Sequence, residues 1–249
     1  MILKEKYKLN CCYFVKVSVY RGKVTLNNKL QNLYEKYFNA LYEGDRKTAA
    51  RVIMEAADEG VDIRDIYLDV FQACQYKIGE LWEKNKMSVA GEHYFSAATQ
   101  LVMSQLYPKI LNENSKNTKG YKFVAASVSN ELHEIGLRMV VDFLELDGWD
   151  TYYLGANTPP DAILQGIIDY NPHVVGLSTT MDYYIPEITT AIEKIRESKG
   201  EKELKIMVGG YPFIEDRNLW KKVGADAFAV NARDAVEVAN TLVEQVEEV

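Results

Sequence analysis

The chain of 249 residues is 47% hydrophobic and 26% charged, an ordinary balance for a globular protein with one large domain or two modest ones. Its formal net charge of −7 argues against direct binding of nucleic acid, and no apolar run approaches the length of a membrane span. We therefore expect neither a nucleic-acid partner nor a membrane-embedded one.

The first 24 residues are locally basic and mildly apolar, and we leave them unassigned, as an arm or a short added strand. Lys16 interrupts the apolar run and no small-residue cleavage site follows it, so a signal peptide is not expected. The three cysteines, Cys11, Cys12 and Cys74, have no metal-site spacing and leave one unpaired in any disulfide scheme. A reducing, cytoplasmic compartment fits this pattern best.

Residues 25–112 repeat apolar side chains at helical spacing and predict a four-helix bundle. The first helix is expected over 28–42 and the second from the cap Asp45 to about residue 59. The remaining two are expected over 62–83 and from the cap Ser88 to about residue 111, with a bend near Pro108. The polar stretch 113–120 is the predicted linker.

Trp82 and the pair Glu92-His93 stand out within this bundle. Glu92 and His93 point in neighbouring directions near the start of the fourth helix, and Trp82, at the end of the third, can approach the same place. Periodicity alone favours an ordinary account, in which Trp82 is a core residue and Glu92-His93 a half-exposed pair.

Residues 121–249 alternate between strand and helix patterns. Strands are expected at 122–128, 151–154, 173–178, 204–208 and 227–230. Five strands alternating with helices predict a parallel, doubly wound sheet of the flavodoxin-like, Rossmann-like type. No Gly-x-Gly-x-x-Gly follows the first strand, which disfavours a dinucleotide site. His173, after Asn171-Pro172, is interpreted as a strand-entry residue and not as a ligand.

The stretch 127–136, Ser-Val-Ser-Asn-Glu-Leu-His-Glu-Ile-Gly, joins the first of these strands to its helix. Open α/β sheets bind ligands in such loops, so His133 can point toward a bound metal. Glu131 can accept the other ring N–H, which would fix the tautomer, and Gly136 leaves room for a large planar ligand. The alternative is a helix start with an incidental histidine.

Glu131-x-His133-x-x-Gly136 resembles the Asp-x-His-x-x-Gly signature of cobalamin-binding domains. The resemblance implies that His133 replaces the benzimidazole of the cofactor as lower cobalt ligand. Glu131 stands where most members carry Asp, and this departure resembles the adenosylcobalamin-dependent photoreceptors of the CarH type, in which Glu is common at this position. The stretch from His133 to Val140 also resembles theirs. The residues of this stretch that the resemblance assigns to the cofactor are Ser129, Glu131, Leu132, His133, Glu134, Ile135 and Gly136.

Two later strand ends fit the same family. Ser178-Thr179-Thr180 occupies the place of its Ser-x-Leu, with Thr180 in place of Leu, and Gly209-Gly210 matches its Gly-Gly. The resemblance implies that Ser178, Thr180, Gly209 and Gly210 line the slot for the displaced benzimidazole tail. Taken singly, such strand ends are more often turns.

Trp82, nine residues and then Glu92-His93 is similar to the pattern of the photoreceptor bundle. The resemblance implies that the bundle caps the upper cobalt face, with Trp82 packed against the 5′-deoxyadenosyl group, Glu92 accepting hydrogen bonds from its ribose and His93 lining the pocket. Glu83 departs from members that carry a His directly after the Trp. A light-adapted state would therefore lack a second His ligand or recruit another, such as His93.

The resemblance implies a light sensor that binds adenosylcobalamin at the domain interface. Cobalt–carbon photolysis would shift the bundle and change the homo-oligomeric state or the binding of an unidentified signalling or regulatory protein. The residues before Leu26 are too few for the winged-helix DNA-binding domain of typical members. We expect a cofactor-binding sensor and not an enzyme, because no acid, base or nucleophile is identified.

The main alternative is a corrinoid methyl-carrier protein of a methyltransferase system, which would use methylcobalamin. A carrier would share the bundle, the sheet and the His ligand, but it has no need for the Trp82…Glu92-His93 pattern. A third class is a passive cobalamin-binding or storage module, or a member that has taken up another tetrapyrrole such as haem.

Overall fold

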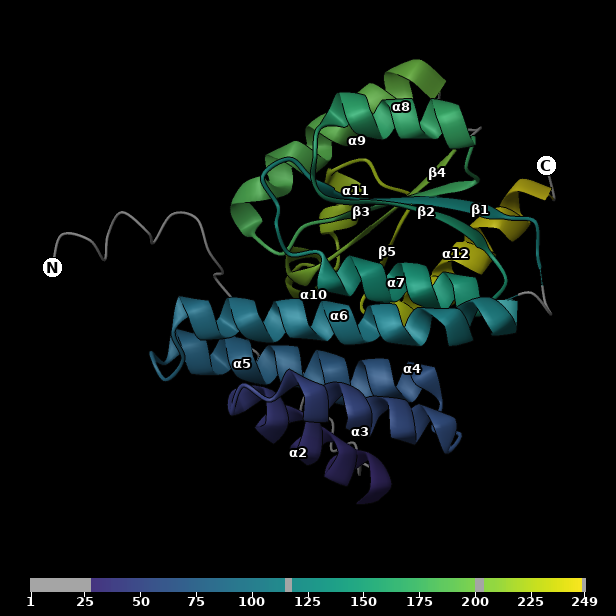
Figure 1. Ribbon diagram of the computed structural model, residues 1–249. Coiled ribbons are helices and arrows are strands. Elements are labelled where there is room, and N and C mark those ends of the chain that lie inside the picture. The colour runs from purple at the N-terminus through teal and green to yellow at the C-terminus, as the bar shows by residue number, and fades with distance from the viewer. Residues whose placement is uncertain (1–27, 115–117, 200–203, 248–249) are drawn as a thin grey trace, which may run out of the picture. The chain divides into compact units, whose positions relative to one another are not determined.

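The computed structural model describes residues 28–114, 118–199 and 204–247 (Figure 1). The unassigned arm of residues 1–24, together with Cys11 and Cys12, lies outside the described residues. Contacts divide the chain into two compact units, one that ends at Leu106 and one that begins at Tyr107. Across the described residues no helix has the length and apolarity that crossing a membrane requires.

The first unit is a helical bundle whose helices begin and end close to the predicted positions. Its helical elements are α2 (Asn28–Tyr42), α3 (Arg46–Asp58), α4 (Ile63–Asp65), the π-helical η1 (Ile66–Gln72), α5 (Ala73–Glu83) and α6 (Val89–Asn114), of which α6 continues past Leu106 into the second unit. The elements α4, η1 and α5 follow one another directly, so the helix expected over 62–83 is present with a π-helical stretch inside it. Aromatic rings fill the core, where Tyr37 lies 5.3 Å from Phe71 and 6.4 Å from Phe95, centroid to centroid.

The predicted caps start these helices. The Asp45 carboxylate accepts a hydrogen bond from Thr48 N at 3.0 Å, and the Ser88 hydroxyl accepts one from Gly91 N at 3.0 Å. Each cap satisfies a backbone donor that the first helical turn leaves without an intrahelical acceptor. Pro108 lies inside α6, which continues as far as Asn114.

The second unit is a five-stranded, fully parallel sheet with strand order β2-β1-β3-β4-β5. Its strands are β1 (Lys122–Val128), β2 (Asp150–Thr158), β3 (Val174–Ser178), β4 (Lys205–Gly209) and β5 (Ala227–Ala229). Its helical elements are α7 (Ile135–Leu146), α8 (Pro160–Tyr170), the 3₁₀ turn η2 (Asp182–Tyr184), α9 (Ile185–Lys199), α10 (Tyr211–Glu215), α11 (Leu219–Lys222) and α12 (Ala232–Glu247). The predicted fold class, a helical bundle followed by a parallel flavodoxin-like domain, is confirmed.

Helices cover both faces of this sheet (Figure 1). One face packs against α8 and α9 through residues such as Ile163, Ile167 and Ile192. The other packs against α7 and α12 through residues such as Leu144 and Leu242. Burial on both faces explains why the strands read as continuous apolar runs.

The strand order places a switch point between β1 and β3. The chain leaves β1 toward β2 on one side and leaves β3 toward β4 on the other, so their loops diverge at the carboxyl edge of the sheet. Open α/β sheets bind ligands at such a point. His133 follows β1 and Thr180 follows β3, so the two loops singled out in the sequence meet there.

The second strand is longer than the expected 151–154. It runs from Asp150 to Thr158, and its pairing with β1 is shifted between Ala125 and Ala126 and again between Ala126 and Val128. At each shift β2 contributes one more residue than β1, which is the pattern of a β-bulge.

The amide of Lys122 donates to His173 Nδ1 at 3.0 Å, so His173 serves strand entry as expected.

Candidate functional site

A buried carboxylate–imidazole pair forms the centre of the β1–α7 loop. His133 Nδ1 lies 2.5 Å from Glu131 Oε1, and the backbone amide of His133 donates to the same oxygen at 2.8 Å. Glu131 is 0% exposed, and the Nε2 atom of His133 is also buried. An Nδ1–H that donates to a carboxylate leaves the lone pair of the ring on Nε2, the tautomer that a metal ligand requires.

Electrostatics keep this carboxylate ionised. Burial opposes ionisation of Glu131, but the hydrogen bond from the His133 ring outweighs it and holds the pKa of the carboxyl below its usual value. Backbone N–H groups of His133 and Thr180 act in the same direction. The pair is therefore suited to raise the basicity of Nε2 toward a cation.

The second oxygen of Glu131 reaches the loop after β3. Its Oε2 accepts hydrogen bonds from the Thr179 hydroxyl at 3.0 Å, Thr180 N at 2.6 Å and Met181 N at 3.3 Å. One carboxylate thus links the loops on both sides of the switch point. Sequence reasoning missed Thr179, although a hydroxyl directly after Ser178 at a strand end was a visible signal.

The glycine pair after β4 supports the same region. Gly210 has φ +105°, and a Cβ there would lie 1.9 Å from the carbonyl oxygen of Thr179. Glycine at 210 is therefore required by the close approach of the β3 loop, independently of any ligand. Ser178 is the last residue of β3 and lies between Ser127 of β1 and Gly209 of β4 in the sheet.

The remaining loop residues have different surroundings. Leu132 is 60% exposed, and a Cβ added at Gly136 would meet nothing within 4 Å, so neither residue is tightly packed. Ser129 and Ile135 are half-buried. The Glu134 carboxylate accepts hydrogen bonds from the Tyr153 hydroxyl at 2.8 Å and Ala156 N at 3.1 Å. Part burial and the nearby carboxylate raise the pKa of Tyr153, which keeps this donor protonated.

The bundle residues singled out in the sequence all lie in the first unit. Trp82 is half-buried near the end of α5, and Glu83 is exposed. Glu92, in the first turn of α6, is 5% exposed, whereas the side chain of His93 is 55% exposed. The distance from His93 Nε2 to Glu92 Oε2 is 3.6 Å.

A chain of hydrogen bonds extends inward from Glu92. The Ser96 hydroxyl lies 2.8 Å from Glu92 Oε1 and 3.0 Å from Gln75 Oε1. Gln75 Nε2 donates to Thr99 Oγ1 at 2.9 Å, and the Tyr37 hydroxyl donates to the same atom at 3.0 Å. This buried polar chain, Glu92–Ser96–Gln75–Thr99–Tyr37, was not anticipated from the sequence.

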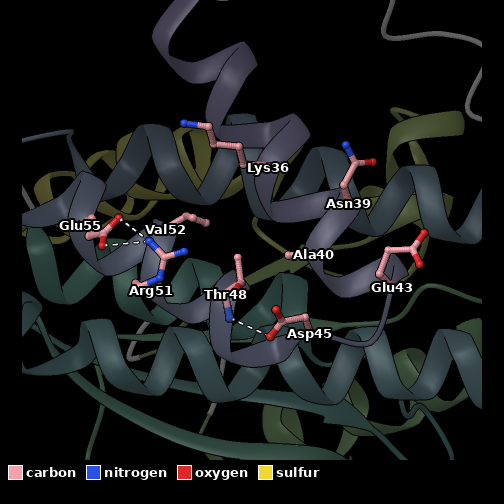
Figure 2. Close-up of a pocket in the computed structure, with 9 residues that line it drawn as sticks. All are labelled: Lys36, Asn39, Ala40, Glu43, Asp45, Thr48, Arg51, Val52 and Glu55. Carbon is pink, nitrogen blue, oxygen red and sulfur yellow. Dashed lines mark hydrogen bonds and ion pairs between the residues drawn. The ribbon is translucent and has the colours of Figure 1, made fainter.

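A hollow on the bundle surface between α2 and α3 contains none of the predicted site residues (Figure 2). Its lining residues are Lys36, Asn39, Ala40, Glu43, Asp45, Thr48, Arg51, Val52 and Glu55. Arg51 pairs with Glu55, and Asp45 caps α3 (Figure 2). Some of its charges are therefore engaged in contacts within α3.

The donor set fits a metal that brings most of its own ligands. Within the ranges that the structure describes, no three His, Cys, Asp or Glu side chains are grouped to hold an ion. One imidazole with a carboxylate behind it suits a cobalt ion already held by a corrin ring, and Gly136 in the same loop leaves space where a side chain would otherwise stand. His133 would ligate the cobalt, and Glu131 would orient His133.

Two models of protein families match this chain. Residues 121–239 match the protein family described as the B12 binding domain, and residues 33–107 match a second family with the same description. The chain is similar to dimethylamine corrinoid protein 1 of Methanosarcina acetivorans, with 27% identity over 79% of this chain and 91% of that protein. It is also similar to trimethylamine corrinoid protein 1 of the same organism, with 24% identity over 83% and 94% of the two chains.

A solved structure shares the fold. The monomethylamine corrinoid protein of Methanosarcina barkeri superposes with a TM-score of 0.73 at 21% identity, covering 88% of this chain and 99% of that one. With the two family matches, this establishes that the chain contains a cobalamin-binding, Rossmann-like domain preceded by a helical region.

These relatives overturn the light-sensor interpretation. The relatives reported above are corrinoid proteins named for methylamines, and none of them is a CarH-type photoreceptor. The prediction rested on Glu131 in place of Asp and on the Trp82…Glu92-His93 pattern. Neither feature requires light sensing, because the longer Glu131 side chain spans two loops and Glu92 has hydrogen-bond contacts inside the bundle.

Proposed function

We propose that this chain is a corrinoid methyl-carrier protein of a methyltransferase system. The observation that carries the proposal is the Glu131–His133 pair, found in a chain similar over most of its length to dimethylamine and trimethylamine corrinoid proteins. A carrier needs a cofactor that accepts and releases a methyl group and a protein that holds this cofactor without consuming it.

His133 would be the lower ligand of the corrinoid cobalt. When bound, the corrinoid supplies a cobalt centre that can take up and give back a methyl group. His133 offers Nε2 to that centre, and Glu131 holds the imidazole through Nδ1. Because Glu131 is fixed by Thr179, Thr180 and Met181, the imidazole is oriented before the cofactor arrives.

The other predicted lining residues belong to the proposal as well. Ser178, Thr180, Gly209 and Gly210 would line the slot for the displaced nucleotide tail of the corrinoid, with Ser129, Leu132, Ile135 and Gly136 around the ring. For Trp82, Glu92 and His93 we propose a role beside the cofactor without assigning an adenosyl group. Methylcobalamin, and not adenosylcobalamin, is the form that fits the relatives.

The proposed partner is a methyltransferase. The relatives named for dimethylamine and trimethylamine suggest a methylated amine as the source of the methyl group. The proposal places the chain in the cytoplasm, where reducing conditions keep a thiol such as Cys74 free.

The test is a methyl-transfer assay in darkness. The purified full chain would be incubated separately with methylcobalamin and with adenosylcobalamin, and unbound cofactor removed by gel filtration. The methylcobalamin-loaded chain would then be mixed with a small thiol and a corrinoid-dependent, thiol-methylating methyltransferase. We expect methyl thioether in amounts matching the bound cofactor, and only when both proteins are present.

Two controls separate the alternatives. Free methylcobalamin at the same concentration measures transfer that does not need the chain. Binding without chain-dependent transfer would replace the carrier by a passive binding module, and failure to retain either corrinoid would refute the proposed function altogether.

A further inference from the structure

The loop that carries His133 is also held from the side of β2. The Tyr153 hydroxyl and Ala156 N both donate to Glu134 Oε2, at 2.8 and 3.1 Å. Glu134 directly follows His133 and is the N-cap residue of α7. These bonds fix the point at which the ligand loop becomes helix.

Asn157 contacts the same loop at Asn130 and Glu131, which lie three and two residues before His133. Its Oδ1 accepts a hydrogen bond from Asn130 N at 2.7 Å, and its backbone N–H donates to the carbonyl of Glu131 at 2.9 Å. Glu131 is the residue whose side chain orients His133. Asn157 therefore fixes the backbone from which the orienting carboxylate projects.

The backbone in this contact is unusual on both sides. Asn130 has φ 65° and Asn157 has φ 51°, in the left-handed region that residues other than glycine seldom adopt. Asparagine tolerates this region better than most residues. Such conformations persist where the surrounding structure enforces them, and they are concentrated at functional sites.

The irregularity of β2 brings these groups to the loop. Both register shifts against β1 fall between Tyr153 and Thr158, the segment that contains Ala156 and Asn157. Bulges re-aim side chains and are over-represented beside active sites. The end of β2 is thus built to contact the β1–α7 loop and not to continue the regular ladder.

We propose that Tyr153 and Asn157 are positioning residues for His133, which hold its loop from β2 so that Nε2 stays directed at the corrinoid cobalt. The inference rests on the proposed function, because it needs a bound corrinoid. Neither residue is assigned contact with the cofactor: Tyr153 acts through Glu134, and Asn157 acts through Asn130 and Glu131.

The consequence concerns ligation and not retention of the cofactor. A loosened loop would let water compete with imidazole for the lower face of cobalt, while the other contacts still hold the corrinoid. Removing an outer-shell partner of a metal-ligating histidine commonly costs on the order of 10- to 100-fold in metal affinity. For each of these residues we expect the lower end, a drop of about tenfold in the ratio of imidazole-ligated to water-ligated cobalt.

The test compares Tyr153→Phe and Asn157→Gly with the parent chain, each loaded with methylcobalamin. Phenylalanine removes only the hydroxyl, and glycine keeps the left-handed backbone while removing only the side-chain acceptor. Absorption spectra would measure the ligation ratio. Electron paramagnetic resonance after photolysis to cob(II)alamin would show whether a nitrogen couples to cobalt.

The matched control is Tyr152→Phe, one residue earlier on β2, whose ring stacks on Tyr170 at 4.0 Å. Asn157→Asp keeps the acceptor and is expected to keep the parental ratio. An unchanged ligation ratio in both test variants would refute the inference, even if their thermal stability falls. An equal change of the ratio in the Tyr152→Phe control would refute it as well. A parent chain that binds corrinoid without nitrogen coupling would instead refute the assignment of His133.

Discussion

Two buried glutamates, one in each unit, lie beside a histidine, and their surroundings differ. Glu131 is 0% exposed and interacts with five groups: His133 N and Nδ1, the Thr179 hydroxyl, Thr180 N and Met181 N. Glu92 is 5% exposed, lies near the Ser96 hydroxyl and is 3.6 Å from His93 Nε2. Only the first pair has hydrogen-bond geometry between carboxylate and imidazole.

The two carboxylates differ in where their partners lie: those of Glu131 come from two loops, the β1–α7 loop and the loop after β3, whereas the Ser96 partner of Glu92 lies one turn away on the same helix. Ser96 has one hydroxyl hydrogen, yet it lies within hydrogen-bond distance of both Gln75 Oε1 and Glu92 Oε1. It can donate to only one of them at a time. A Glu next to a His in sequence therefore does not define an oriented ligand; donors from distant loops do.

The largest expected contrast is between the two histidines. His133→Ala should abolish nitrogen coupling to cobalt in a corrinoid-loaded chain, because Nε2 of His133 is the proposed lower ligand. His93→Ala should leave it intact, since Glu92 does not hold the exposed imidazole in a ligand tautomer. Electron paramagnetic resonance of the cob(II)alamin form measures both, and the opposite result would exchange their roles.

The next effect is on stability. Glu131→Gln keeps the size of the side chain but replaces a charged acceptor of several donors by a neutral amide. Hydrogen bonds to charged groups contribute roughly 1.5–3 kcal/mol each, so we expect a loss of about 2 kcal/mol in the free energy of unfolding. Denaturant titration of the cofactor-free chain at neutral pH checks this, and parental stability would show that the carboxylate charge is dispensable.

The same substitution should change how the free energy of unfolding depends on pH in the acidic range. The pKa of Glu131 is lowered in the folded chain, so its contribution is fully present above the unfolded value, near pH 4.3, and is lost as pH falls through the folded pKa. The stability difference between parent and Glu131→Gln should therefore be constant near neutrality and shrink below about pH 4. A difference that does not depend on pH would contradict the assigned ionisation.

The smallest effect is expected at Glu92. A glutamine there can donate its amide N–H to Ser96, which frees the Ser96 hydrogen for Gln75. We expect Glu92→Gln to change the free energy of unfolding by no more than about 0.5 kcal/mol. Ser96→Ala is the matched control and should cost about 1 kcal/mol, because Gln75 Oε1 loses its donor. A large loss in Glu92→Gln would show that this carboxylate is as constrained as Glu131.

Local patterns predicted the elements of the fold well. Caps at Asp45 and Ser88, and apolar spacing between them, placed the helices, and continuous apolar runs placed β1 and β3 to within a residue. The same reasoning missed the extent of β2, because bulges are set by what a strand contacts and not by its own apolar pattern.

The candidate site was predictable only in part. Glu131 and His133 lie two residues apart, so their interaction was visible in the sequence. The bonds from Thr179 and from Tyr153 join residues far apart in the chain and follow from strand order and bulges. The light-sensor prediction was wrong because residue patterns in the bundle do not reveal what each side chain contacts.

The edges of the sheet restrict how this protein can associate with others. β2 carries two register shifts, and β5, at the opposite edge, is only three residues long. Straight, long edge strands recruit further strands, whereas bulged or short ones discourage this. Strand-to-strand aggregation through the described sheet is therefore disfavoured, so encounters with partners are directed to side-chain surfaces of loops and helices.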